Sequence, residues 1–165
     1  MNVTISSAIL LITTIIAASI FTAAALQQLY AFQNAFKEVG MRNEEMFSTS
    51  ITIIGETRGT LPDGPNTIII WVKNTGRTSF TLTGTSWDLF ITFPDESYKR
   101  FNYNSTAECS DCWDATILNG NGNGVWEEGE TIQITAHTAS VPAGSYEVRL
   151  ALPNGVTCED KFSLG

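Results

Sequence analysis

The sequence predicts an α+β fold in which a long N-terminal hydrophobic helix precedes an immunoglobulin-like antiparallel β-sandwich. The first charged side chain is Lys37, and the 36 residues before it contain no Asp, Glu, Lys, Arg or His. From residue 48 onward, apolar and polar residues alternate in short runs, which is the period of a half-buried strand. Pro, Gly and Asn separate these runs, as expected for turns. We therefore expect two domains, a hydrophobic polymerisation helix over 1–47 and an extracytoplasmic β-sandwich over 48–165.

The helix is expected from about Val3 to about Met46, because Ala, Leu and Ile dominate and no Pro interrupts them. The uncharged part alone would reach about 54 Å at about 1.5 Å per residue, whereas a bilayer core is about 30 Å thick. A transmembrane anchor and a helix that polymerises with its own copies both fit this length. Small and hydroxylated residues at spacings that allow close helix packing support polymerisation; they are Ser7, Ala8, Thr14, Ala18, Ser19, Thr22 and Ala25.

A cleaved signal peptide explains the N-terminus less well. Such peptides begin with basic residues and have an apolar run of about 7–15 residues, but here no Lys or Arg precedes a much longer run. We expect the helix to be retained and to anchor the chain in a membrane. The sequon Asn104-Ser105-Thr106 makes Asn104 a candidate glycosylation site, and the cysteines suit an oxidising compartment. Both features place the β domain outside the cytoplasm.

Seven strands are expected in the second domain. They are Ser48–Glu56, Asn66–Lys73, Trp87–Phe93, Ser97–Asn102, Thr131–Thr138, Ser145–Leu152 and Val156–Leu164. The turn-rich stretch Leu61–Pro65 is expected to connect the first two, and Pro-containing turns follow at Pro94, Pro142 and Pro153. This number and spacing of strands predicts the immunoglobulin-like sandwich.

Charge and composition exclude several function classes. The net charge is -8, and no Lys or Arg lies between Phe101 and Glu147, so the chain is not expected to bind nucleic acid through its phosphates. With a single histidine, no Ser-His-Asp set stands out beyond chance, and no Walker-type glycine loop is present. The sequence therefore predicts a protein that is not an enzyme.

One loop resembles a calcium-binding sequence. In the twelve residues from Asn119, oxygen-bearing side chains occupy positions one, three and five, Gly occupies position six and Glu position twelve. The candidate ligands are Asn119, Asn121, Asn123 and Glu130, and calcium is the ion that this loop would suit. Asn in place of Asp lowers the ligand charge, so binding is expected to be weak. The alternative interpretation is a Gly-Asn turn between strands.

The three cysteines allow several arrangements, including a disulfide in which Cys158 takes Cys109 or Cys112 as its partner. Cys109 and Cys112 are close enough in sequence for a local disulfide, which would leave Cys158 unpaired. Alternatively, Cys158 and His137 could complete a Cys₃His zinc site, although the spacings match no ordinary zinc module. We favour the Cys109–Cys112 disulfide.

Four segments carry a resemblance to a known family. They are Ser6–Ile12, Ile68–Gly76 with its Val-Lys-Asn-Thr-Gly ending, Asn119–Glu130 and the Pro-Ala-Gly-Ser-Tyr stretch that begins at Pro142. In these segments the chain resembles the archaellum accessory proteins of the G type (FlaG-like), to which the F type (FlaF-like) is closely related. The resemblance implies a type IV pilin-like architecture, an extracytoplasmic β domain, and a role in holding the motility motor against the cell envelope.

The expected function is therefore that of a structural subunit of the archaellum, the archaeal flagellum. Its expected partners are other copies of itself through the N-terminal helix, the membrane, and archaellum or S-layer proteins of the envelope. Two alternatives remain. One is a main shaft subunit of an archaeal pilus-like filament, and the other is a single-pass membrane-anchored module that binds glycan or calcium.

Overall fold

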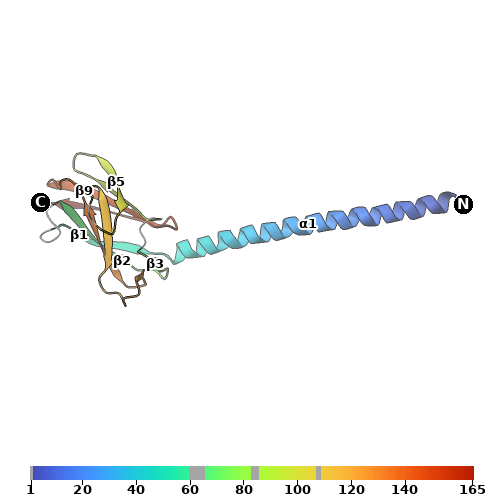
Figure 1. Ribbon diagram of the computed structural model, residues 1–165, viewed down its shortest axis with the longest axis horizontal. Helices are drawn as coiled ribbons and strands as arrows, with labels where there is room; N and C mark the ends of the chain where they lie inside the picture. The colour runs from blue at the N-terminus through green and yellow to red at the C-terminus, as the bar shows by residue number, and fades with distance from the viewer. Residues whose placement is uncertain (1, 60–65, 83–85, 107–108) are drawn as a thin grey trace. The chain divides into compact units, whose positions relative to one another are not determined.

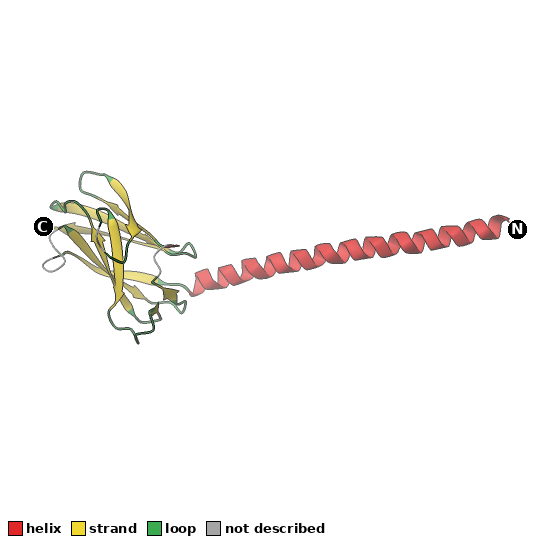
Figure 2. Ribbon diagram, in the orientation of Figure 1, coloured by secondary structure: helices red, strands yellow, loops and turns green. Residues whose placement is uncertain are grey.

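The computed structural model describes residues 2–59, 66–82, 86–106 and 109–165. The chain divides into two compact units, Met1–Asn43 and Glu44–Gly165. Figures 1 and 2 show one long helix, α1 (Asn2–Ser48), followed in the described residues by strands joined by loops. The strands are β1 (Ile51–Arg58), β2 (Thr67–Asn74), β3 (Phe80–Thr81), β4 (Asp88–Thr92), β5 (Tyr98–Tyr103), β6 (Cys112–Ile117), β7 (Val125–Trp126), β8 (Thr131–His137), β9 (Gly144–Ala151) and β10 (Thr157–Leu164).

Helix α1 exposes every side chain from Ile5 to Phe47. By length and composition it is suited to cross a membrane. Four of its hydroxyl groups are satisfied internally, because Thr13, Thr14, Ser19 and Thr22 each donate to a backbone carbonyl three or four residues earlier, at 2.8–2.9 Å. These side chains can therefore lie in an apolar layer without leaving a hydroxyl unpaired.

Eight strands are hydrogen-bonded to one another in the order β1-β2-β8-β6-β5-β4-β9-β10, while β3 and β7 form a separate two-stranded sheet. The order divides into two four-stranded layers, joined where β5 pairs with β6. That pairing is parallel and brief, linking Asn102 with Cys112 and Tyr103 with Trp113, whereas the other pairings are antiparallel. The predicted long helix followed by a β-sandwich is confirmed, with this one parallel contact as a departure from a purely antiparallel sheet.

A single hydrophobic core lies between the two layers. Alternate residues point inward along β2, β4, β8 and β9, and the core contains Ile68, Leu89, Ile134 and Val148, all of them fully buried. Three tryptophans fill the centre, with the ring of Trp87 5.6 Å from that of Trp126 and 6.2 Å from that of Trp113. Burial of this aromatic cluster provides much of the apolar area that stabilises the sandwich.

The two ends of the strand order, β1 and β10, lie against each other. Glu56 of β1 lies beside Asp160 of β10 there. Burial, together with the neighbouring Asp160 carboxylate, raises the pKa of Glu56 from an ordinary 4.5 to about 7. One oxygen of the Glu56 carboxyl is buried without a hydrogen-bond partner.

This carboxyl pair predicts a pH-dependent stability. Because the pKa of Glu56 is higher in the folded state, folding takes up a proton between about pH 4.5 and pH 7, and stability falls as pH rises through that range. Glu56→Gln should remove this dependence and raise stability at pH 8 by about 1–2 kcal/mol, after allowance for solvent screening. Chemical denaturation at pH 5 and pH 8 measures the free energy of unfolding of the parent and the variant. Glu128→Gln, at an exposed position, is the control for the change in net charge. Equal pH dependence in the parent and Glu56→Gln would contradict the assignment.

The strands expected from sequence all occur, with ends shifted by up to three residues. Three further strands, β3, β6 and β7, were not expected. Two of them have only two residues each, too few for an alternating pattern. The predicted turn Leu61–Pro65 lies outside the described residues.

Candidate functional site

The turn that follows β2 is organised by one buried asparagine. Asn74 is completely buried, and its Nδ2 donates to the carbonyl of Thr78 at 2.8 Å and to that of Trp126 at 3.4 Å. Its Oδ1 accepts from the backbone N–H of Gly76 at 3.0 Å. A buried amide with its donors and acceptor occupied fixes the turn in one conformation.

The same turn binds the segment that follows α1. The backbone N–H groups of Thr75 and Gly76 both donate to the carbonyl of Ser50 at 2.8 Å, and that of Arg77 donates to the carbonyl of Ser48 at 2.8 Å. A Cβ atom at Gly76 would lie 2.3 Å from the backbone nitrogen of Ser50 and 2.5 Å from the carbonyl oxygen of Ser48. Only glycine allows the two backbones to approach this closely.

The last turn of α1 is held by hydroxyl groups of the sandwich unit. Thr49 Oγ1 donates to the carbonyl of Glu45 at 2.7 Å, and Thr78 Oγ1 donates to the same carbonyl at 3.3 Å. Ser48 and Thr78 share a hydroxyl hydrogen bond of 2.7 Å, and Asn154 Nδ2 donates to Thr49 Oγ1 at 2.7 Å. The two bonds to Glu45 satisfy a carbonyl that a helix end leaves without a partner, and the other two hold the hydroxyl groups in place. The division between domains at residues 47 and 48 stays a prediction, although the compact sandwich unit already includes Glu44.

The loop Asn119–Glu130 lies beside this turn, because Asn74 N–H donates to the Glu130 carbonyl at 2.9 Å and Gly129 N–H donates to the Asn74 carbonyl at 2.8 Å. Within the loop, the side chain of Glu130 is buried and accepts from the N–H groups of Asn121 at 3.3 Å and Glu127 at 2.9 Å. Asn119 Oδ1 accepts from Thr131 N–H at 2.6 Å. The predicted ligands therefore share one short loop.

Glu127 is the residue of this loop that the sequence interpretation did not select. Its two carboxylate oxygens accept from Asn121 Nδ2 at 3.0 Å and Asn123 Nδ2 at 2.9 Å. It stands at the ninth position counted from Asn119, a position that calcium loops also use, so the template could have identified it. The Oδ1 atoms of Asn121 and Asn123 accept from the N–H groups two residues later, at 3.0 and 2.8 Å.

Calcium binding at this loop stays a prediction. An ion would compete with these hydrogen bonds, so we expect a dissociation constant in the millimolar range. A site at about 100 times its dissociation constant would stabilise the fold by about 2.7 kcal/mol, which a melting curve detects. Glu130→Gln should abolish the calcium-dependent rise in melting temperature, while the exposed Glu96→Gln should leave it intact. A melting temperature that does not respond to calcium would exclude the site.

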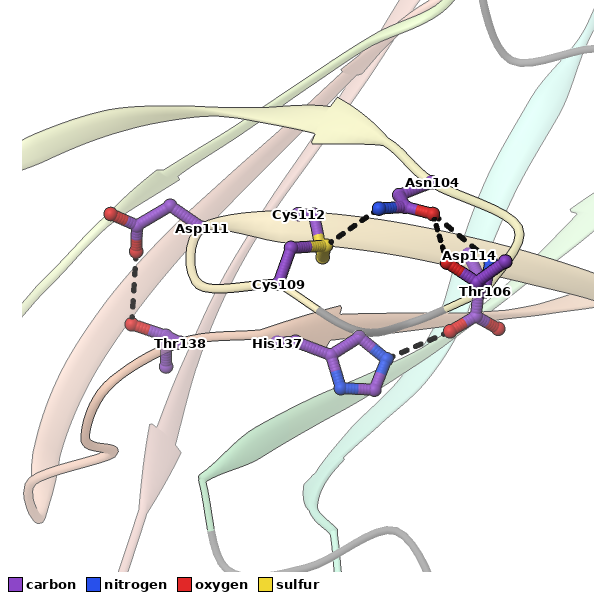
Figure 3. Close-up of a disulfide and its surroundings, with 8 residues drawn as sticks. All are labelled: Asn104, Thr106, Cys109, Asp111, Cys112, Asp114, His137 and Thr138. Carbon is purple, nitrogen blue, oxygen red and sulfur yellow. Dashed lines mark hydrogen bonds and ion pairs between the residues drawn. A yellow bond between two sulfur atoms is a disulfide. The ribbon is translucent and has the colours of Figure 1, made fainter.

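Cys109 and Cys112 form a disulfide, with their Cα atoms 5.9 Å apart (Figure 3). The bond closes a very short loop in which Asp111 has a positive φ of 60°. Asp111 in turn binds Lys99 Nζ through both carboxylate oxygens at 3.0 Å and accepts from Thr138 Oγ1 at 3.3 Å. The loop is thereby fixed against β5 and the end of β8.

The structure does not assemble the alternative zinc site. Cys158 is a free thiol on β10, and His137 binds Asp114 at 2.8 Å (Figure 3). Within the described residues, no group of three or more His, Cys, Asp or Glu side chains is placed to hold a metal ion. Burial raises the pKa of the Cys158 thiol to about 12, which keeps it protonated and poorly nucleophilic.

We expect one disulfide and one unreactive thiol in the mature protein. Intact mass should rise by about two hydrogens on reduction, and native Cys158 should resist iodoacetamide at pH 8 but react fully after denaturation. Cys158→Ala should leave the mass change intact, whereas Cys109→Ala should remove it. Three thiols that react in the unreduced native protein would contradict this arrangement.

Asn104 lies directly beside the disulfide. Its Nδ2 donates to Cys109 Sγ at 3.2 Å, while its Oδ1 accepts from the N–H and hydroxyl of Thr106 at 3.0 and 2.8 Å (Figure 3). Glycans attach to the same Nδ2 atom. Glycosylation at Asn104 stays a prediction, and it would have to replace the contact with Cys109.

Comparisons with known proteins place the chain in a family. The sequence model for archaeal-type flagellins matches residues 2–162. An uncharacterized protein of Archaeoglobus fulgidus is 30% identical over 164 residues, covering 96% of each chain. The archaellum periplasmic stator protein FlaG from Sulfolobus acidocaldarius has a TM-score of 0.55 and 21% identity, over 69% of this chain and 99% of that one. The archaellum periplasmic stator protein complex of FlaF and FlaG from the same organism has a TM-score of 0.53 and 20% identity, over 68% of this chain and 87% of that one. At these identities the solved structures show a shared fold.

Proposed function

Because the chain belongs to the archaeal-type flagellin family, we propose that it is a structural, non-enzymatic, pilin-like subunit of the archaellum that assembles through α1. In this proposal the helix lies in the membrane or in a bundle of its copies, and the sandwich stands outside the membrane. The observation that carries the proposal is the charge-free start of α1, whose large apolar side chains from Ile5 to Phe36 are exposed. Exposed apolar surface of this extent needs lipid or other helices to cover it.

Within the archaellum, we favour a stator component that anchors the motor to the envelope. The sandwich shares its fold with a protein named as a periplasmic stator, and in a solved complex that protein is combined with a second stator protein. By analogy, the partners of this chain are its own copies, the membrane, and an envelope or S-layer protein that contacts the sandwich. These roles rest on similarity of fold.

Truncation tests the assembly proposal. The structure favours a cut before Glu44, since a chain starting at Ser48 would lose the Glu45 carbonyl that Thr49 and Thr78 bind. The Glu44–Gly165 chain should be soluble and monomeric, while the full chain in mild detergent should form sedimentable polymers visible by negative-stain microscopy. A full chain that stays monomeric at high concentration would show that α1 is a membrane anchor and does not mediate assembly.

A shaft subunit is the second candidate, favoured because the flagellin model matches the helix and the sandwich together. Immunogold labelling of the native surface separates the two roles. Label along the filament would identify a shaft subunit, whereas label confined to the filament base would support the stator. If the chain is a membrane-anchored module that binds calcium or glycan, the label would instead be dispersed over the cell surface.

A further inference from the structure

The outer face of the layer β5-β4-β9-β10 carries a stacked pair of aromatic rings. Phe90 of β4 and Tyr98 of β5 lie with their ring centres 5.3 Å apart and their planes nearly parallel, at 10°. Both point away from the core, because Leu89, Ile91 and Phe101, in the alternate set of each strand, are buried. Tyr98 is 58% exposed, so part of its ring is open to solvent. We propose that this ring pair is the platform of a binding site for a neutral saccharide.

Polar side chains complete a groove beside the rings. Its volume is about 210 Å³, and it is lined by Phe90, Thr92, Tyr98, Glu147 and Arg149. The strand register brings these side chains together, since Phe90 lies opposite Arg149 on β9 and Thr92 lies opposite Glu147. A hydroxyl, a carboxylate and a guanidinium therefore stand beside the stacked rings.

A sugar ring matches this combination of groups. The C–H groups on the apolar face of a pyranose are weakly positive, and the face of an aromatic ring is negative, so the two attract when stacked. The hydroxyl groups of a sugar both donate and accept hydrogen bonds. Glu147 can accept from them, while Arg149 and Thr92 can donate to them. Apolar surface with a few placed polar groups is the usual composition of a small-molecule site.

The charges on this face neutralise one another. Three ion pairs cross it, with N–O distances of 2.5–3.5 Å; they are Arg100–Asp88, Arg149–Glu159 and Lys161–Glu147. A charged partner would have to compete with these pairs, whereas a neutral saccharide can bond to the lone pairs and N–H groups that they leave free. The local balance of charge, in a chain with a net charge of -8, therefore favours a neutral ligand.

A protein partner fits this face less well. A standard protein interface buries about 800 Å² on each partner, around an apolar centre. Among the exposed large apolar side chains that the structure describes in the strands and loops of the sandwich, only Tyr98 lies on this face. Ile54 lies on β1 and Leu118 follows β6, both in the other layer. One exposed ring with a half-buried neighbour can cover a sugar ring, but it cannot form the centre of a protein interface.

Titration of the full chain with saccharides tests the site. The chain is kept in a detergent that has no sugar headgroup, and calorimetry follows the addition of trisaccharides of glucose, mannose, galactose or N-acetylglucosamine. We expect at least one of these neutral saccharides to bind, with a dissociation constant in the millimolar range. Tyr98→Ala should weaken that binding by at least about tenfold, because the stacking is lost. Tyr98→Phe keeps the ring and should bind within about threefold of the parent.

Leu118→Ala is the matched control. Leu118 is 54% exposed, close to the value for Tyr98, but it lies in the other layer, so its removal should leave saccharide binding unchanged. Arg149→Ala should weaken binding, because it removes a donor from the groove. Thermal unfolding followed by the fluorescence of the buried tryptophans verifies that each variant is folded.

The outcomes are separate from those of the assembly proposal, because the inference goes beyond assembly and concerns the sandwich alone. Absence of binding to every saccharide of the panel would overturn the site. Equal affinity of the parent and a folded Tyr98→Ala variant would also overturn it, since the saccharide would then bind elsewhere. Either result leaves polymerisation through α1 intact, and a chain that binds saccharide through Tyr98 but never polymerises would overturn the assembly proposal alone.

Discussion

Gly76→Ala is expected to destabilise the sandwich by about 3 kcal/mol and to lower its melting temperature by about 10 °C. The added Cβ would lie 2.3 Å from the Ser50 nitrogen and 2.5 Å from the Ser48 oxygen, so a backbone segment has to move. Movement would break the hydrogen bonds that Thr75, Gly76 and Arg77 donate to this segment. The expected loss combines steric strain with backbone groups left unpaired.

Thermal unfolding followed by tryptophan fluorescence measures this effect, because Trp87, Trp113 and Trp126 are buried in the sandwich core. Gly55→Ala is the matched control, since its Cβ would meet only the Trp71 ring at an ordinary 3.5 Å. A melting temperature for Gly76→Ala within about 2 °C of the parent would show that the turn tolerates a side chain, contrary to the structure.

Ile15→Lys should prevent polymerisation of the full chain altogether. The side chain lies in the middle of the uncharged run and is 58% exposed on α1, so each copy would place a charge in an apolar layer. That placement costs about 2.5–3.5 kcal/mol per copy on the insertion scale, and a polymer repeats the cost at every subunit. Sedimentation and negative-stain microscopy should find no filaments.

The matched control is Ile15→Leu, which keeps size and apolarity and should polymerise like the parent. Membrane fractionation of Ile15→Lys is the second measurement, because the many other apolar residues should still insert the helix. Filaments of normal length from an inserted Ile15→Lys protein would exclude burial of this residue in an assembly core.

The helix and most strands could be predicted from local patterns. The absence of charge before Lys37 and the alternation after residue 48 depend on neighbouring residues alone. Strand β6 was missed although Trp113 to Ile117 alternates apolar and polar residues, because the run is short and only Trp113 and Ile117 are large apolar residues. The parallel pairing of β5 with β6 depends on the order of strands in space, which no local pattern encodes.

The roles of single residues were harder to predict. The Val-Lys-Asn-Thr-Gly segment stood out only as a resemblance, because the burial of Asn74 depends on contacts with Trp126 and Thr78. Glu56 looked like an ordinary strand residue until β10, more than one hundred positions later, brought Asp160 to it. The cysteine spacing, in contrast, indicated the disulfide that the structure contains, because its two partners are three residues apart.

The turn at Asn74–Gly76 also has a mechanical consequence. Tension applied to the chain at Ser48 would be shared at once between β1 and the end of β2, through the hydrogen bonds that Thr75, Gly76 and Arg77 donate to Ser48 and Ser50. Strand β2 lies inside the sheet, between β1 and β8, so the force would spread over several ladders instead of peeling one edge strand away. Bonds loaded together rupture at higher force than bonds loaded one after another. A subunit that resists the torque of a rotating filament would benefit from this load sharing.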